Sequence, residues 1–212
     1  AHAGQDWLAA EEMRDPARLM EMRLALALSH SSYQCASFGT FLVDACRMVR
    51  TCLDNGLSDL SSIACVAYTT AMSAMKQPYA EVYAMGKLAL TLGEARDNRH
   101  YRITVYQYFA PFYQHWAEPL QNTVPLLDRA IELGMCGMNP LSTGYCVLLR
   151  AVNRFIYGVP LEELEFEAER ALRFLERSHL TNTDAMLRHG VLQPLAALRG
   201  KTLDPLSFDN EA

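Results

Sequence analysis

Proline recurs at a fixed interval in this chain, and this recurrence constrains the fold more than any other feature. Pro78, Pro119 and Pro160 lie 41 residues apart, each between two segments with helical patterns. Proline is tolerated in the first turn of a helix, because its missing N–H would have no intrahelical partner there. Each of the three prolines is therefore predicted to open the second helix of a helix pair.

The same interval recurs in the apolar residues behind these prolines. The matching sets are Ala89, Ala130 and Ala171, and Leu92, Leu133 and Phe174. Gly93 and Gly134 follow in the first two copies, where a glycine can take the left-handed conformation that ends a helix. Three matched copies predict repeat pairs at about residues 57–97, 98–138 and 139–179.

The first helix of each pair carries apolar residues at the 3.6-residue period of an amphipathic helix. In the fifth expected helix, one face consists of Tyr101, Val105, Tyr108, Phe109, Phe112 and Trp116. No segment of useful length shows the alternation of a β-strand. We therefore expect an all-α chain of about nine helices, folded as a right-handed α-α superhelix (solenoid) of antiparallel helix pairs with a period of about 41 residues.

These repeats set the expected domain boundaries. Residues 1–14 are expected to form a flexible N-terminal segment, residues 15–200 a single helical-repeat domain, and residues 201–212 a mobile tail. The domain is expected to begin at Asp15 and Pro16, whose side chains suit a helix cap and a first helical position.

A partial fourth pair is expected from residue 183, with one helix that runs to about Arg199. Its apolar stripe consists of Met186, Leu187, Val191, Leu195 and Leu198. Leu192 lies off this stripe, and no second helix follows in the sequence to cover it. Since the end of a repeat array must be polar or be covered by the next unit, we expect an exposed apolar patch near Leu192.

Two further prolines fall inside expected helices. Pro111 lies in the fifth helix and Pro125 in the sixth, where the other copies carry ordinary residues. An internal proline removes a backbone hydrogen bond and clashes with the preceding turn, at a cost of about 3 kcal/mol. Each of these prolines is therefore expected to kink or shorten its helix.

Composition excludes several classes of protein. A net charge of -5 does not fit a nucleic-acid-binding surface, which needs a basic stripe. No apolar run reaches the roughly 18 to 20 residues that span a bilayer, and the first residues lack the pattern of a signal peptide. Six cysteines without a CxxC spacing indicate free thiols in a reducing compartment. We expect a cytoplasmic protein with no nucleic-acid and no membrane partner.

The sequence lacks the common motifs of catalytic and metal sites. No GxxxxGK[ST] loop is present to cradle a phosphate, and no HExxH or paired CxxC to hold zinc. A Cys–His nucleophile pair would meet only in the fold, and the sequence leaves it open. We expect no catalytic residue, no cofactor and no metal ligand.

An acidic run could suggest a metal site or a basic partner. It consists of Glu162, Glu163, Glu165, Glu167 and Glu169. The helix dipole favours acidic residues at the start of a helix and basic ones, here Arg173 and Arg177, near its end. Glu169 and Arg173 also have the spacing of an ion pair within a helix. A solvated helix face explains the run better than a metal site does.

Side chains off the core stripe mark a candidate partner groove. In stacked helix pairs the first helices usually line the concave surface, and tyrosine and arginine are frequent in binding hot spots. The candidate residues are Tyr106, Tyr113, Gln114, Arg150, Asn153 and Arg154. The alternative is that the tyrosines pack on neighbouring helices, with their hydroxyls at the surface.

With its repeat, the chain resembles a tetratricopeptide-type array with longer helices, because the usual period is about 34 residues. The segments LMEMRLALALSHSSYQ, LDNGLSDLSSIACVAY and EVYAMGKLALTLGEA resemble, more narrowly, a helical region of large multidomain signalling proteins. In that family the region follows a predicted AAA-type ATPase module, often with a Ser/Thr kinase domain upstream and GAF and histidine-kinase domains downstream. The resemblance covers roughly residues 16–177, and the family contributes no catalytic residue from this region.

The leading functional hypothesis is a protein-interaction or regulatory scaffold, as a segment or relative of such a signalling protein. Its partner would be a protein or peptide, or neighbouring domains of a longer parent chain, and a homodimer is a further option. The alternative is a sensor that holds an apolar small molecule between helices. A sensor needs an enclosed apolar pocket of several hundred Å³, whereas a scaffold needs an open groove.

Overall fold

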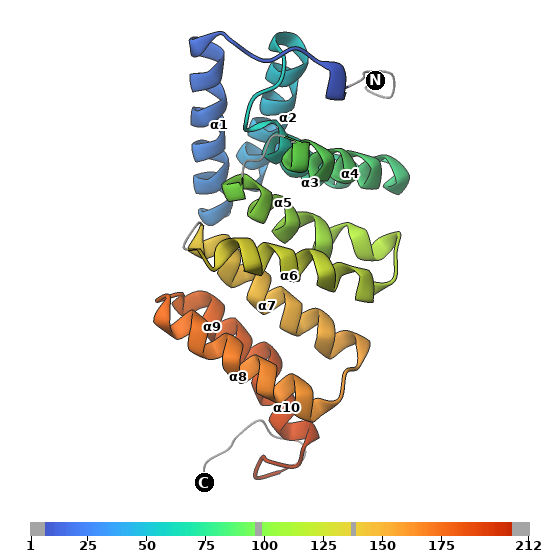
Figure 1. The fold of residues 1–212 in the computed structure, drawn as a ribbon, viewed down its shortest axis with the longest axis vertical. Coiled ribbons are helices and arrows are strands. Elements are labelled where there is room, and N and C mark those ends of the chain that lie inside the picture. The colour runs from blue at the N-terminus through green and yellow to red at the C-terminus, as the bar shows by residue number, and fades with distance from the viewer. Residues whose placement is uncertain (1–6, 96–98, 137–138, 205–212) are drawn as a thin grey trace. The chain divides into compact units, whose positions relative to one another are not determined.

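The computed structural model describes residues 7–95, 99–136 and 139–204 (Figure 1). Within these ranges the chain is helical and has no β-strand, which confirms the predicted all-α class. The helices are α1 (Pro16–Gln34), α2 (Phe38–Asn55), α3 (Ser61–Ala74), α4 (Tyr79–Ala95), α5 (Arg99–Phe112), α6 (Thr123–Gly134), α7 (Pro140–Tyr157), α8 (Leu161–Arg177), α9 (Thr181–Leu187) and α10 (Gln193–Leu198). In the same ranges, no helix has both the length and the hydropathy needed to cross a bilayer.

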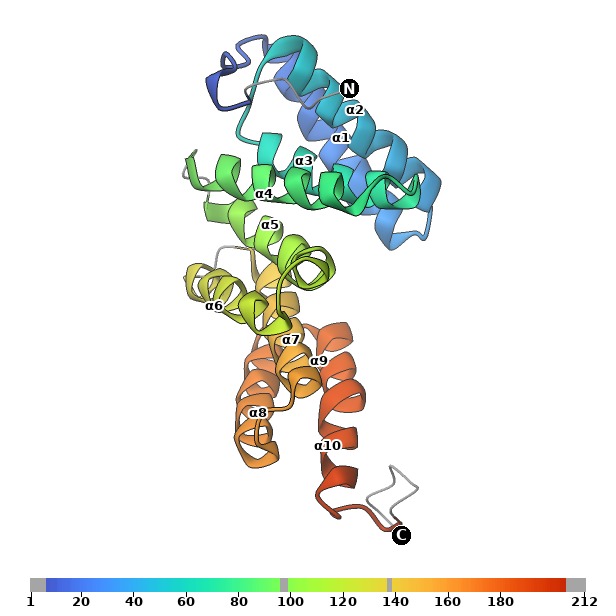
Figure 2. The same ribbon diagram turned by 90° about the vertical axis from the view of Figure 1, so that its right-hand side faces the viewer.

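The chain divides into two compact units, residues 1–109 and residues 110–212, where the sequence predicts a single domain over 15–200. The boundary falls inside α5, two residues before Pro111. In the first unit α1 packs against α2, α2 against α3 and α3 against α4 (Figure 2). In the second, α7 packs between α6 and α8, and α9 packs against α7 and α8.

The N-terminal segment is not flexible over the part that the structure describes. Trp7 and Met13 are buried, and Trp7 opens a short 3-10 turn, η1 (Trp7–Ala9). Leu57 N donates to Glu11 O at 2.8 Å, and Met13 N donates to Leu57 O at 2.8 Å. Two apolar anchors and a backbone bridge thus attach this segment to the loop between α2 and α3. Residues 1–6 lie outside the described residues.

The backbone bridge between the N-terminal segment and Leu57 requires a glycine at position 56. Gly56 follows α2 with φ of +91°, a conformation that L side chains rarely adopt. A Cβ atom built on it would lie 2.5 Å from Glu11 O. Backbone conformation and close approach therefore both select glycine at this position.

The three repeated prolines all lie at helix starts, as predicted, although each is the cap rather than the first helical residue. Pro78 O accepts from Glu81 N and Val82 N ahead of α4, and Pro160 O accepts from Leu164 N ahead of α8. Pro119 caps a 3-10 turn, η3 (Leu120–Asn122), which leads directly into α6. The fixed φ of proline suits a cap whose carbonyl accepts the first helical hydrogen bond.

The two remaining prolines lie near opposite ends of their helices. Pro111 shortens its helix, because α5 ends at Phe112 instead of continuing to Trp116, and a 3-10 turn, η2 (Gln114–Trp116), follows. Pro125 is the third residue of α6. Since the first four N–H groups of a helix have no intrahelical partner, Pro125 costs no hydrogen bond there. The α-helix begins at Thr123, after the 3-10 turn that follows Pro119, so of the two predicted effects Pro125 fits a shortened helix.

The predicted helix-ending glycines have another role. Gly93 and Gly134 lie within α4 and α6, and neither has a left-handed backbone. A Cβ atom on Gly134 would lie 1.9 Å from Thr143 Oγ1, and Thr143 is fully buried on α7. Gly134 therefore permits the close approach of α6 and α7.

The C-terminal helix confirms only part of the predicted stripe. Leu187, Val191 and Leu195 are buried in the core of the second unit, whereas Met186 and Leu198 are exposed. A wide π-helical turn, η4 (Arg188–Leu192), separates α9 from α10. A π-helical turn contains one residue more than an α-helical turn. The buried side chains Leu187, Val191 and Leu195, each four residues apart, therefore stay on one face, and the observed stripe differs from the predicted one.

Leu192 is half-buried and packs against that core, so the predicted patch does not centre on it. The π-helical turn has a local cause. Pro194 lacks an N–H and would clash with the carbonyl of an ordinary preceding turn, and the wider turn avoids both problems. The tail is described only to Asp204, so residues 205–212 lie outside the described residues.

The variant Gly134→Ala should destabilise the second unit. Its added methyl group collides with Thr143 at a helix crossing, which costs about 1–3 kcal/mol by overpacking. Gly39→Ala in α2 is the matched control, because nothing lies within 4 Å of the Cβ atom there. Urea unfolding followed by circular dichroism should show a lower midpoint for Gly134→Ala only. Equal midpoints in both variants would contradict this account of the crossing.

Acid should release α10 from α8. Lys201 Nζ donates to Glu165 Oε1 at 2.5 Å and Arg199 pairs with the same carboxylate, so the pKa of Glu165 is lowered. This stabilisation is complete above the ordinary pKa of 4.5 and is lost as the pH falls through the lowered value.

Hydrogen exchange at residues 193–200, measured as protection relative to α7, checks this prediction. Protection should fall in the acid range in the wild type and should already be low near neutral pH in Glu165→Gln. A protection ratio that stays constant from neutral to acid pH would show that these ion pairs do not hold the helix.

Candidate partner-binding groove

Four of the six predicted groove residues are buried. Tyr106, in the first unit, is fully buried on α5, and its hydroxyl donates to Glu94 Oε1 at 3.1 Å. Gln114 Nε2 donates to Glu118 Oε2 at 2.8 Å and to Asn122 O at 3.2 Å. Tyr113 is buried as well. These side chains pack inside their units, so their prediction as partner contacts is not supported.

Asn153 is the fourth buried residue, and it holds α7 against the start of α6. Its Nδ2 donates to Thr123 Oγ1 at 2.8 Å, and Thr123 Oγ1 in turn donates to Leu120 O at 2.6 Å. Thr123 is fully buried. At Asn153, the face of α7 that the sequence assigns to a groove is therefore covered by α6, and this side chain is not available to a partner.

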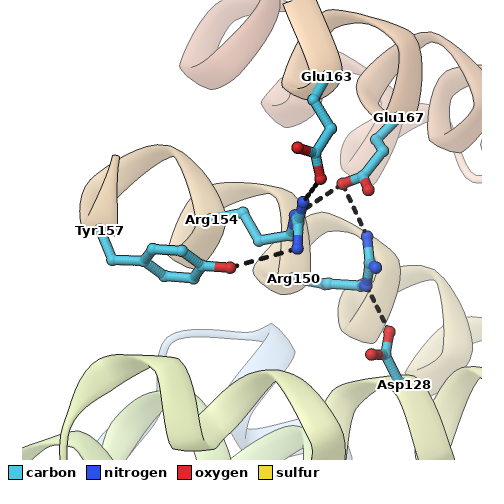
Figure 3. Close-up of polar contacts among 6 residues, drawn as sticks. All are labelled: Asp128, Arg150, Arg154, Tyr157, Glu163 and Glu167. Atoms are coloured by element: carbon cyan, nitrogen blue, oxygen red, sulfur yellow. Dashed lines mark hydrogen bonds and ion pairs between the residues drawn. The ribbon is translucent and has the colours of Figure 1, made fainter. Parts of the chain in front are cut away.

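Arg150 and Arg154 lie one turn apart on α7 and form an ionic network with α6 and α8 (Figure 3). Arg150 Nε pairs with Asp128 of α6, and its Nη1 donates to Glu167 Oε2 of α8 at 3.0 Å. Arg154 pairs with Glu163 of α8. The network thus joins three helices through one turn of α7.

Glu167 is the shared member of this network. One of its carboxylate oxygens, Oε2, accepts from Arg150 and lies 2.8 Å from Arg154 Nε, a charge contact without hydrogen-bond geometry. The Glu167 side chain is 23% exposed and that of Arg154 12%. At this degree of burial an unpaired charge is costly, so the three groups stabilise one another.

The charge of Arg150 is secured by its partners. Burial alone would lower its pKa, but the hydrogen bonds and charges of Asp128 and Glu167 outweigh burial, and the pKa is raised. The Arg150 guanidinium therefore keeps its charge in this half-buried site. The predicted solvated acidic face is thus partly ion-paired, because Glu163 and Glu167 face α7 while Glu162 and Glu165 face the C-terminal end of α10.

Beside this network lies an open groove of about 560 Å³ within the second unit. Its lining is Asp128, Ile131 and Met135 of α6, Val147, Arg150 and Ala151 of α7, and Glu167, Arg170, Ala171, Arg173, Phe174 and Arg177 of α8. Of the predicted residues, Arg150 lines it. We call the apolar residues of this lining the floor of the groove, and Arg170, Arg173 and Arg177 of α8 its arginine wall.

Sequence reasoning missed this arginine wall. Arg173 and Arg177 were assigned to the helix dipole, and Arg170 to no role. The available signal was their spacing, since residues three and four apart lie on one helix face. The sequence does not show that this face borders a groove, because that depends on where α6 lies.

The first unit contains a much smaller cavity. It has a volume of about 20 Å³. Most of its lining residues are apolar, and His30, Thr104 and Tyr108 add polar groups to the lining. This is about the space of one water molecule. An apolar effector would not fit in it.

Burial disfavours the reactive form of two of the cysteines. Burial raises the pKa of the Cys65 and Cys146 thiols, which opposes formation of the nucleophilic thiolate. Within residues 7–95, 99–136 and 139–204, no group of three or more His, Cys, Asp or Glu side chains has the arrangement of a metal site.

No protein-family model, curated protein or solved structure matches this chain. The resemblance to tetratricopeptide arrays and to signalling proteins therefore depends on the sequence patterns. The groove and the ionic network are the features from which a function can be argued.

Replacing the shared carboxylate should destabilise the second unit. Glu167→Gln removes the charge that two half-buried arginines share, and hydrogen bonds to charged groups contribute about 1.5–3 kcal/mol. The matched control is Glu169→Gln on the same helix, whose exposed ion pair with Arg173 spans 3.8 Å and contributes less than about 0.5 kcal/mol. Chemical unfolding of both variants measures the difference; similar losses would refute the central place of Glu167.

Proposed function

We propose that this chain is a non-catalytic helical-repeat scaffold that binds a protein or peptide partner, as a segment or relative of a multidomain signalling protein. The observation that carries the proposal is the open groove across α6, α7 and α8. Its arginine and phenylalanine side chains belong to residue types that are enriched at protein interfaces. An apolar floor with a charged wall offers both burial and orientation to a bound segment.

The positions of the helices support the repeat. The elements α4, η3 and α8 begin at residues 79, 120 and 161, each directly after one of the repeated prolines. Of the expected helix pairs, α3 packs against α4 and α7 packs against α8. We propose on this basis that the period of about 41 residues reflects repeated helix pairs.

The geometry does not favour the sensor alternative. A sensor of apolar molecules needs a largely enclosed apolar pocket of about 300–1,000 Å³. The cavity of the first unit is far smaller, and the groove of the second unit is open and lined by four arginines. A segment of another protein suits such a groove better than an apolar effector does.

A capture experiment with a blocked groove tests the proposal. Ala171→Trp places a large side chain in the groove and leaves every charged residue of the ionic network unsubstituted. Glu132→Trp adds the same side chain at an exposed site of α6 outside the groove. The tagged full chain and both variants are used to capture proteins from the source cells, which are identified by mass spectrometry.

The scaffold proposal expects a partner that the wild type and Glu132→Trp retain and that Ala171→Trp loses. Circular dichroism checks that both variants stay folded. Partner sets that are identical for the two variants would refute the role of the groove.

A further inference from the structure

The lining of the groove contains more arginines than carboxylates to pair with them. Both carboxylates of its lining, Asp128 and Glu167, are already paired with Arg150. The other arginines of the lining are Arg170, Arg173 and Arg177, all exposed on α8. The whole chain has a net charge of -5, so this local excess is a property of the site and not of the composition.

The three arginines of this wall are weakly engaged. Arg170 lies over the Phe166 ring at 5.7 Å, a contact that leaves its N–H groups available to other acceptors. Arg173 approaches Glu169 only at 3.8 Å, with both side chains about half exposed. Among the residues that the structure describes, Arg177 has no ion-pair partner. Their hydrogen-bond donors can therefore serve a bound anion.

The spacing of the wall distinguishes between kinds of anion. With a rise of 1.5 Å per residue, positions 170 to 177 place the three charges along about 10 Å of the helix. A single phosphate is best held by donors that converge on one point, whereas these are arranged in a row. An extended chain advances about 3.3 Å per residue, so a segment of three or four residues spans the row.

The floor of the groove adds a second element of recognition. Phe174 lies on the same helix between Arg173 and Arg177, and it borders the groove together with Ile131 and Val147. An apolar side chain of a ligand can be buried there, while carboxylates beside it face the arginines. Charged and apolar side chains thus both line the groove.

We propose that the groove binds an extended, acidic protein segment, in which aspartate or glutamate residues flank an apolar side chain. This inference rests on the proposed scaffold function, because it assigns a partner chemistry to the same groove. A nucleic acid would need a larger basic surface than one row of three arginines in an acidic chain. Exposed arginine–carboxylate contacts give orientation and salt dependence, and the buried apolar side chain gives affinity.

Fluorescence anisotropy with defined peptides tests this assignment. The probe is a labelled peptide with the repeated sequence Glu-Leu-Glu, titrated with the full chain at low and at high salt. Two further probes replace every glutamate by glutamine or carry one phosphoserine in the glutamine background. The variant is Arg173→Gln/Arg177→Gln, and Arg18→Gln/Arg50→Gln, in exposed ion pairs of the first unit, is the control with the same change in charge.

The acidic peptide should bind the wild type and the control equally and should bind the groove variant about tenfold more weakly. High salt should weaken binding to the wild type, and the glutamine peptide should bind the wild type at least about tenfold more weakly than the acidic peptide does. Equal binding to both double variants, no binding of the acidic peptide, or tighter binding of the phosphopeptide would overturn the proposal.

The same variants separate this inference from the scaffold function. If Ala171→Trp abolishes partner capture while the acidic peptide does not bind, the groove is an interaction site with a different partner chemistry, and the inference fails alone. If the acidic peptide binds as expected and Ala171→Trp blocks it, the inference stands even where capture identifies no partner.

Discussion

The carboxylate of Glu167 lies between two arginines of α7, and the arrangement of the second unit depends on this contact. Arg150 extends it to Asp128 of α6, so that one turn of α7 fixes the helices on both of its sides. Half-buried charges of this kind tolerate few alternative arrangements, because any shift leaves a charge without its partner. These side chains hold α6 and α8 at their separation on the two sides of α7, while the apolar core of the unit supplies most of the stability of its fold.

The same network explains why the groove is positively charged in an acidic protein. Helix α8 directs Glu163, Glu165 and Glu167 toward arginines and a lysine elsewhere in the unit. Those carboxylates are neutralised inside the unit, whereas the arginines of the second half of the helix face the groove. A helix that has both signs of charge in its sequence therefore presents mainly one sign at the groove. The net charge of a chain is a poor guide to the charge of a particular site.

The candidate site was predictable only in part, and its failures share a physical cause. Tyrosine, asparagine and arginine off a core stripe are expected at a surface, yet Tyr106 and Asn153 are buried with hydrogen-bond partners. The partner of Asn153 is Thr123, 30 residues away, and no local pattern indicates that these two side chains meet. Arg150 lines the groove of the second unit, whereas the arginine wall of α8 was not among the predicted residues. Whether a helix face outside the core stripe is buried depends on which other helices pack against it, and the sequence does not show this.

The sequence by itself determined the local features of this protein: the all-α class, the helix starts at the repeated prolines and the end of α5 beside Pro111. These follow from φ angles, missing N–H groups and apolar periodicity, which act within a few residues. Only the tertiary structure decided that Gly134 serves a helix crossing, that residues 7–14 bridge to Leu57, and that a π-helical turn precedes Pro194. It alone placed the arginines of α8 beside a groove, because a groove exists only where distant helices have packed together.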